Sequence, residues 1–275
     1  MIDLKRVKIG CIGTGTMGGA LIKAICKQTD PRNITVSAAH FEKAQAFAEK
    51  NGCNAVESNA EVAKKSQYIF VAVKPQYVRS VLKETAAYVK DSTVIISMAA
   101  GVTLEQLSQV FVSETSKIPT IIRIMPNMPA SVDEAMIALC CNEVISSDAL
   151  ETVSRLLESA GKVEKVDEKL MDCVTAVSGS GPAYVFMFIE ALADAAVRFG
   201  MPRSQAYIYA AQTMKGAACM VLEDGRTPAE LKDAVCSPAG TTIEGVAALE
   251  KLGFRNAVIE AATAAFNKSV SMSKK

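Results

Sequence analysis

The chain of 275 residues has no tryptophan, one histidine and almost no net charge. The near-zero net charge bears directly on the partners that the protein can bind. Lysine and arginine number 30 against 29 aspartates and glutamates, which leaves a net charge of +1 at pH 7. Proteins that bind nucleic acid concentrate basic residues to neutralise phosphates. We therefore expect no nucleic-acid partner.

Metal-binding patterns are also missing. His40 is the only histidine, and the eight cysteines contain no C-x-x-C pair. Zinc sites draw on such pairs and on histidines at fixed spacings. We expect no metal site, and we interpret the cysteines as free thiols in a reducing compartment.

The apolar runs are shorter than a membrane-spanning helix requires. The N-terminal MIDLKRVKIG has no apolar segment followed by a small-residue cleavage site. The most apolar later stretch, Ala183–Ile189, is soon followed by Glu190, Asp194 and Arg198, whereas a span needs about 20 apolar residues. The expectation is a soluble cytoplasmic protein with no membrane partner.

The first 166 residues alternate short β-branched runs with helical patterns. Most runs are continuously apolar, which is typical of parallel strands covered on both faces. The expected strands are Val7–Ile12, Ile34–Ala38, Tyr68–Val73, Val94–Met98 and Ile121–Met125, with Ala135–Leu139 and Lys162–Val166 as edge strands. Helices are expected at Met17–Cys26, Phe41–Lys50, Thr103–Val110 and Asp148–Ala160, and Thr103 with Gln106 has capping-box spacing. The pattern predicts an α/β, Rossmann-like domain over residues 1–166.

From residue 167 to residue 275 the pattern is helical throughout. Glycine and proline separate the helices expected at Pro182–Phe199, Arg203–Leu222, Pro228–Val235, Thr242–Lys251 and Arg255–Ser271. The segment AYVFMFIE is apolar on nearly every face, and FRNAVIEAATAAF adds a small-residue surface. A domain of this size has limited means of covering such helices. We expect burial against a second copy, in a homodimer or a larger homo-oligomer; packing on the chain's own first domain is the alternative.

The stretch GCIGTGTMGG contains Gly13, Gly15 and Gly18 in the spacing G-x-G-x-x-G, between an expected strand and an expected helix. This context is the one that a dinucleotide fingerprint requires. The first glycine allows the tight turn, the second lets the backbone approach the pyrophosphate, and the third permits close packing of helix on strand. The helix N-terminus then faces the anion. The alternative is a structural turn in another α/β protein.

The end of the second strand bears on the choice of cofactor. NAD sites place an acidic residue there to hold the ribose 2′-hydroxyl, and this chain has none before Glu42. Ser37, His40 and Lys43 could instead hold a 2′-phosphate. The sequence therefore favours NADP, with NAD still open. His40 is alternatively a solvated loop residue, and it is poorly placed for a general base.

Two further loops follow expected strands. Lys74 and Pro75 end the third strand in FVAVKPQ, where open α/β sheets bind ligands, although an ordinary turn with a solvated lysine is the alternative. Asn127 lies between two prolines in RIMPNMP, which we interpret as a rigid ledge lining the nicotinamide end.

A second turn of small residues, SPAGTT, leads into a helix of the C-terminal half. Free amides at the helix start, with the hydroxyls of Ser237, Thr241 and Thr242, suit a small carboxylate. A plain loop with a helix cap is the alternative.

The chain resembles the pyrroline-5-carboxylate reductase family along its whole length. GCIGTGTMG, FVAVKPQ, AAGVTLEQL, RIMPNMP, AVSGSGPAYVF and LKDAVCSPAGTTIEGVAALE stand in the family's order and spacing. The resemblance implies a Rossmann-like domain followed by helices of an interlocked dimer. It also implies hydride transfer from NAD(P)H to the C=N bond of 1-pyrroline-5-carboxylate, which gives L-proline as the last step of proline biosynthesis.

The resemblance further implies roles for individual residues, with Thr242 Oγ reaching the ring nitrogen as the catalytic contact. The cofactor-binding candidates are Gly13, Thr14, Gly15, Thr16, Met17, Gly18, Ser37, His40, Asn59, Val73, Lys74 and Pro75. The substrate-binding candidates are Ser237, Gly240, Thr241 and Thr242. Ala234 and Ala239 depart from the family pattern, and the backbone angles at Ala239 are therefore open.

Two other functions remain open from the sequence. Hydroxyacid dehydrogenases of the same two-domain plan carry a lysine after their G-x-G turn, whereas GSGPAYVFMFIE has none. A related imine or hydroxyacid reductase is thus an alternative. So is a non-catalytic NADP-binding sensor, which would show a damaged substrate turn.

Overall fold

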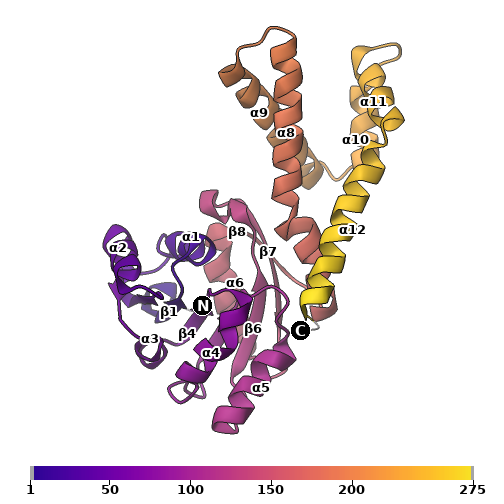
Figure 1. Ribbon diagram of the computed structural model, residues 1–275. Coiled ribbons are helices and arrows are strands. Elements are labelled where there is room, and N and C mark those ends of the chain that lie inside the picture. The colour runs from indigo at the N-terminus through magenta and orange to yellow at the C-terminus, as the bar shows by residue number, and fades with distance from the viewer. Residues whose placement is uncertain (1–2, 274–275) are drawn as a thin grey trace. The chain divides into compact units, whose positions relative to one another are not determined.

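The structure is a computed structural model that describes residues 3–273 (Figure 1). The chain forms two compact units, which are described separately below. One unit runs to Gly179 and resumes at Ala265, and the other comprises Ser180–Ala264. The boundary expected after residue 166 marks the change from alternating strands and helices to helices alone, whereas the two units are distinguished by the contacts within each. The expected boundary stays a prediction.

The first unit is built on an eight-stranded sheet in the order β3-β2-β1-β4-β5-β6-β7-β8. All neighbouring strands are parallel except β6 and β7. The strands are β1 (Ile9–Ile12), β2 (Ile34–Ser37), β3 (Asn54–Ala55), β4 (Tyr68–Val71), β5 (Val94–Ser97), β6 (Thr120–Met125), β7 (Ala135–Cys141) and β8 (Gly161–Lys165). The predicted Rossmann-like α/β fold is confirmed.

Two details of the sheet differ from the expectation. β3 has two residues and no apolar run, so it carries no strand pattern in the sequence. β7 was expected at an edge, but it pairs with β6 on one side and β8 on the other, and only β8 is an edge strand at that end. A short connection through the 3-10 helix Met128–Val132 returns the chain directly beside β6, which is possible only for antiparallel strands.

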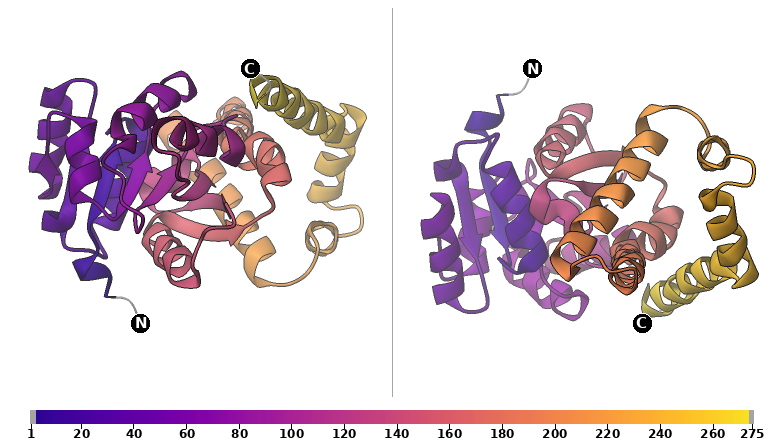
Figure 2. Two further views of the ribbon diagram at one scale, coloured as in Figure 1. Left: turned by 90° about the horizontal axis from the view of Figure 1, so that it is seen from below. Right: turned by 90° about the horizontal axis from the view of Figure 1, so that it is seen from above.

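Helices cover both faces of the sheet (Figure 2). On one face lie α1 (Thr16–Ile25), α2 (Phe41–Asn51) and α6 (Ser147–Leu157), and on the other lie α3 (Asn59–Lys65), α4 (Pro75–Ala86) and α5 (Leu104–Thr115). Every residue of β1, β2 and β5 is buried. This two-sided burial is the physical reason for the continuous apolar runs.

Short helical segments complete the first unit. The expected capping box is present, because Thr103 accepts from the amide of Gln106 while the Gln106 side chain accepts from the amide of Thr103. The remaining segments are the 3-10 helices Leu4–Arg6, Pro31–Asn33, Met128–Val132, Glu158–Ala160 and Glu168–Leu170, α7 (Met171–Val174) and a π-helix over Thr175–Gly179.

The second unit is helical, as predicted. Its elements are α8 (Gly181–Arg198), α9 (Arg203–Glu223), α10 (Pro228–Val235), α11 (Thr241–Lys251) and α12 (Phe254–Ser273), the last of which continues into the first unit. α8 and α9 form an antiparallel pair around the small core Ala193, Ala206 and Ala210 (Figure 1). α8 also contacts α12, where the rings of Phe188 and Phe254 lie 5.8 Å apart between centroids.

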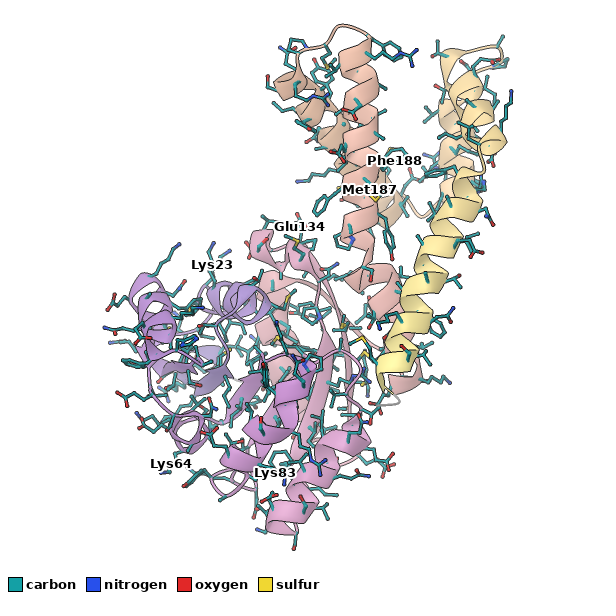
Figure 3. All side chains as sticks on the ribbon, viewed as in Figure 1. Lys23, Lys64, Lys83, Glu134, Met187 and Phe188 are labelled. Atoms are coloured by element: carbon teal, nitrogen blue, oxygen red, sulfur yellow. The ribbon has the colours of Figure 1, made fainter. Side chains whose placement is uncertain are left out.

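Large apolar side chains remain exposed on these helices. Figure 3 shows Met187 and Phe188 projecting from α8, and Met187 is 69% exposed. Other exposed apolar residues are Phe199, Ile208, Leu222, Leu252 and Ile259. By length and composition, the helical run Glu168–Arg198 could also cross a membrane, and only 11% of its most apolar window is buried. Within one chain, most of this apolar surface has no cover.

Candidate dinucleotide and substrate sites

The turn between β1 and α1 requires its first glycine. Gly13 has a φ of +106°, a conformation that residues with a Cβ rarely adopt. A Cβ at this position would also lie 2.4 Å from the backbone oxygen of Ala72, at the end of the neighbouring β4. The predicted role of Gly13 in the tight turn is confirmed.

The third glycine brings α1 close to the sheet. A Cβ on Gly18 would stand 2.2 Å from the Gly13 oxygen and 2.5 Å from the Ala72 Cβ, so any larger residue would push the helix away. Gly15 differs, because it is the exposed N-cap of α1 and a Cβ there would meet nothing within 4 Å. No side chain caps this helix. Its first amides therefore have no side-chain cap, and such amides suit an anion such as a pyrophosphate.

The end of β2 is tied to this turn. The amide of Gly13 donates to the Ser37 oxygen at 2.8 Å, and the Ser37 hydroxyl donates to Asn59 Oδ1, also at 2.8 Å. Asn59, the first residue of α3, donates in turn from Nδ2 to the Glu84 carboxylate at 2.8 Å. The structure thus brings the predicted residues Gly13, Ser37 and Asn59 together. Glu84 joins them from α4, and no pattern near Asn59 points to it.

The remaining cofactor candidates surround the same edge of the sheet. Lys74 is the exposed N-cap of α4 and Pro75 is its first residue, so the chain turns away directly after β4. His40 is exposed at the start of α2, where its side chain forms no capping hydrogen bond. Thr14, Thr16 and Met17 belong to the glycine turn and the first residues of α1, and Val73 follows β4. Binding by these side chains stays a prediction.

The Asn127 side chain is held within the fold, and the expectation that RIMPNMP forms a rigid ledge lining the nicotinamide end stays a prediction. Its side chain is only 8% exposed, donates to the Ser178 oxygen at 3.1 Å and accepts from the Met136 amide at 3.0 Å. Both ends of the amide are therefore committed to backbone groups. Asn127 fixes the turn between β6 and β7 against the π-helix that contains Ser178.

A partly buried ion pair joins β6 to the segment after β8. Arg123 of β6 has a side chain 6% exposed and contacts Glu168 at 3.1 Å. Glu168 also accepts from the amide of Leu104, at the start of α5, at 2.7 Å. One carboxylate thus joins β6, α5 and the segment that leads to α7. No sequence pattern indicated this pair, because its members are 45 residues apart.

The substrate turn lies in the second unit, between α10 and α11. Gly240 is the N-cap of α11, and no side chain caps the helix. The turn closes on itself through the amide of Gly240, which donates to the Ser237 oxygen at 3.0 Å. Ser237 and Thr241 are exposed, and Thr242 is half-buried. Because neither the serine nor the threonines cap the helix, the first amides of α11 stay available to a ligand.

Ala239 adopts a left-handed conformation in this turn, with a φ of +55°. The departure from the family pattern at this position therefore affects a residue whose backbone favours glycine.

A pocket of about 620 Å³ in the first unit lies between α4 and α5. Pro75, Arg79, Gly101, Gln106, Val110 and Met272 are among its lining residues. Pro75 is the predicted cofactor residue that borders it, and the fingerprint glycines lie elsewhere.

The structure also bears on the reactivity of the cysteine thiols and on metal binding. Burial, with a smaller contribution from Cys53, raises the pKa of Cys11 to about 12 and that of Cys26 to about 11. Thiols with such values are poor nucleophiles at neutral pH. Among residues 3–273, no group of three or more histidine, cysteine, aspartate or glutamate side chains is placed to hold a metal ion.

A doubly wound sheet with an open G-x-G-x-x-G turn, followed by a helical unit, defines a two-domain dinucleotide-dependent oxidoreductase. Residues 168–272 match the family model described as pyrroline-5-carboxylate reductase dimerisation, and residues 8–101 match the model described as NADP oxidoreductase, coenzyme F420-dependent.

Named relatives cover nearly the whole chain. The pyrroline-5-carboxylate reductase of Escherichia coli is 45% identical over 97% of this chain and 98% of its own length, and that of Synechocystis is 40% identical over 98% and 99%. A crystal structure of the Plasmodium falciparum pyrroline carboxylate reductase with NADP bound is similar at a TM-score of 0.87 and 33% identity, with 98% and 99% of the chains covered. A structure of the Coxiella burnetii pyrroline-5-carboxylate reductase is similar at a TM-score of 0.89 and 32% identity, with 98% of this chain and 99% of that chain covered. The chain belongs to the pyrroline-5-carboxylate reductase family.

Proposed function

We propose that this protein reduces 1-pyrroline-5-carboxylate to L-proline with hydride from NADPH, the last step of proline biosynthesis. Family membership supports the reaction. The observation that carries the proposal is the intact substrate turn, in which the first amides of α11 have no side-chain cap. A damaged turn would have favoured a non-catalytic sensor.

The glycine turn would hold the cofactor. Its pyrophosphate would lie at the N-terminus of α1, against the backbone of Gly13–Gly18 and the side chains of Thr14 and Thr16, and its adenosine ribose would lie near Ser37 and Asn59. Val73, Lys74 and Pro75 would extend along the dinucleotide. His40 would face a 2′-phosphate. Because β2 ends without an acidic residue, NADPH is expected to give a higher kcat/KM than NADH.

The second turn would hold the substrate. The amides of Thr241 and Thr242 would bind the carboxylate with help from the Ser237 hydroxyl, Gly240 would shape the turn beside it, and Thr242 Oγ would hydrogen-bond the ring nitrogen. The bound cofactor supplies a hydride to the imine carbon, and the electron pair of the C=N bond passes to nitrogen, which becomes the secondary amine of proline. A protonated imine is already electrophilic, so positioning supplies much of the catalysis and no histidine is required.

We further propose that the working unit is a homodimer or a larger homo-oligomer in the cytoplasm, without membrane or nucleic-acid partners. The match of residues 168–272 to a dimerisation model supports a homo-oligomer. The exposed apolar faces of α8 and α9 support the same assembly, and a second copy would also cover the apolar run Glu168–Arg198.

A spectrophotometric assay tests the reaction directly. The purified protein is mixed with 1-pyrroline-5-carboxylate and NADPH, and the loss of reduced-nicotinamide absorbance is compared with the L-proline formed. Equal amounts are expected. NADPH binding without turnover would favour the sensor, and turnover of a keto acid in place of the pyrroline would favour a hydroxyacid reductase.

A further inference from the structure

Asn59 is held from both sides by groups on other elements. Its Oδ1 accepts from the Ser37 hydroxyl of β2, and its Nδ2 donates to the Glu84 carboxylate of α4, both at 2.8 Å. Ser37 is 1% exposed, so its hydroxyl has no ready alternative in solvent. The two contacts fix which end of the Asn59 amide faces which partner.

The position of this group within the fold is that of the adenosine ribose. In dinucleotide-binding sheets, the ribose hydroxyls are read at the end of the second strand, beside the glycine turn. Ser37 is the last residue of β2, and its oxygen accepts from the amide of Gly13 at 2.8 Å. One hydrogen bond links Ser37 to Asn59, and a second links Asn59 to Glu84.

Glu84 sets the orientation of the amide. A primary amide can rotate by half a turn and exchange its donor and acceptor ends. The carboxylate accepts and cannot donate, so it selects the orientation in which Nδ2 faces α4 and Oδ1 faces Ser37. Nδ2 keeps a second N–H, and that donor suits a ribose hydroxyl.

Glu84 also brings a negative charge to this place. In the described part of the chain it forms no ion pair, and the adjacent Lys83 pairs with Glu114 at 3.1 Å. β2 ends without an acidic residue, but Glu84 of α4 brings a carboxylate to the same group through its bond with Asn59. A charge at this location opposes a 2′-phosphate and tolerates a 2′-hydroxyl.

We propose that Glu84 is a positioning and specificity-determining residue for the dinucleotide. Through Asn59 it orients the donor offered to the ribose, and through its charge it limits the preference for NADPH over NADH. The proposal rests on the proposed dinucleotide-dependent function, but it concerns only the adenosine half of the cofactor. It can therefore be tested without turnover.

The experiment compares wild-type protein with Glu84→Gln, Glu84→Ala and the control Glu49→Gln. Glu49 is an exposed acid of α2 whose carboxylate accepts from the Gln45 side chain. Calorimetric titrations use ADP-ribose, with a 2′-hydroxyl, and its 2′-phosphorylated form. The Glu84→Gln variant removes the charge and keeps an oxygen, Oε1, that can accept from Asn59 Nδ2, whereas Glu84→Ala removes both the charge and the acceptor.

For Glu84→Gln, affinity for the 2′-phosphorylated probe is expected to rise about three- to tenfold at low salt, with ADP-ribose changed less than about twofold. For Glu84→Ala, affinity for ADP-ribose should fall about three- to tenfold, because Asn59 loses its orientation. Glu49→Gln should leave the ratio of the two affinities unchanged.

An unchanged ratio in Glu84→Gln, or the same change in Glu49→Gln, would overturn the charge role. Unaltered binding of ADP-ribose to Glu84→Ala would overturn the positioning role. A purely structural role would move both probes together, and thermal unfolding of each variant would detect it. If 1-pyrroline-5-carboxylate proved not to be the substrate, the binding results would still decide the inference.

Discussion

At the scale of single residues, Ala239 is the position where sequence and backbone conflict. Its φ of +55° costs a residue with a Cβ about 1 kcal/mol relative to glycine. We expect Ala239→Gly to stabilise the protein by about 0.5–1 kcal/mol, measured by thermal unfolding. The control is Ala234→Gly in the nearby α10, where glycine should destabilise by about 0.5–1 kcal/mol. A lower melting temperature for Ala239→Gly would show that the turn is not left-handed in solution.

Thr242 provides the residue-scale test of the substrate site. A hydrogen bond to a charged group is worth about 1.5–3 kcal/mol, so Thr242→Ala should lower kcat/KM for the pyrroline about 10- to 150-fold. The Kd for NADPH should not change. Thr242→Ser retains the hydroxyl and should recover most of the loss. If Thr242→Ala retained full kcat/KM, the residue would not belong to the site.

Single residues were predictable where the cause is local. Gly13 and Gly18 follow from a spacing pattern, and the capping box of Thr103 lies within four residues. Glu84 and the bonds of Asn127 were not predictable. Glu84 lies 25 residues from Asn59, and Asn127 bonds both Ser178, 51 residues away, and Met136, 9 residues away across the turn. The fold, and no local pattern, brings these groups together.

At the scale of elements, the Glu168 carboxylate joins three segments that the sequence treats as independent. Removing it in Glu168→Ala would leave the buried Arg123 guanidinium and the Leu104 amide without their acceptor. We expect a loss of about 2–4 kcal/mol in the free energy of unfolding, measured with urea. The pair Lys162–Glu164 is exposed, so the control Glu164→Ala should cost less than about 1 kcal/mol. Equal losses would mean that the Arg123 pair contributes no more than a surface contact.

Helices and strands were predictable where burial of one face gives the apolar residues a regular spacing in the sequence. The five expected C-terminal helices agree with α8–α12 to within two residues at each end, because glycine and proline separate them. The direction of β7 was not predictable. Its apolar run shows burial alone, and its pairing depends on the turn that Asn127 stabilises.

At the scale of the whole molecule, the apolar surface of the helical unit decides the assembly. Phe199 and Leu252 are each 82% exposed within one chain, and Met187, Ile208 and Leu222 of α8 and α9 are exposed as well. Composition along the sequence predicted this surplus, since helices that are apolar all round exceed what a small domain can bury. Which surfaces meet in the assembly depends on a second copy, and one chain's sequence does not specify that.

Subunit mixing tests whether each active site uses two chains. Gly15→Asp places a carboxylate where the pyrophosphate should bind, and Thr242→Ala weakens the substrate turn. If the substrate turn of one subunit serves the cofactor turn of its partner, each mixed dimer has one site with both defects and one with neither. Random exchange should then restore about a quarter of the wild-type activity, well above either variant alone. A dimer that exchanges subunits without recovery would place each site within one chain. A fully active 29.2 kDa monomer in sedimentation would contradict the dimer itself.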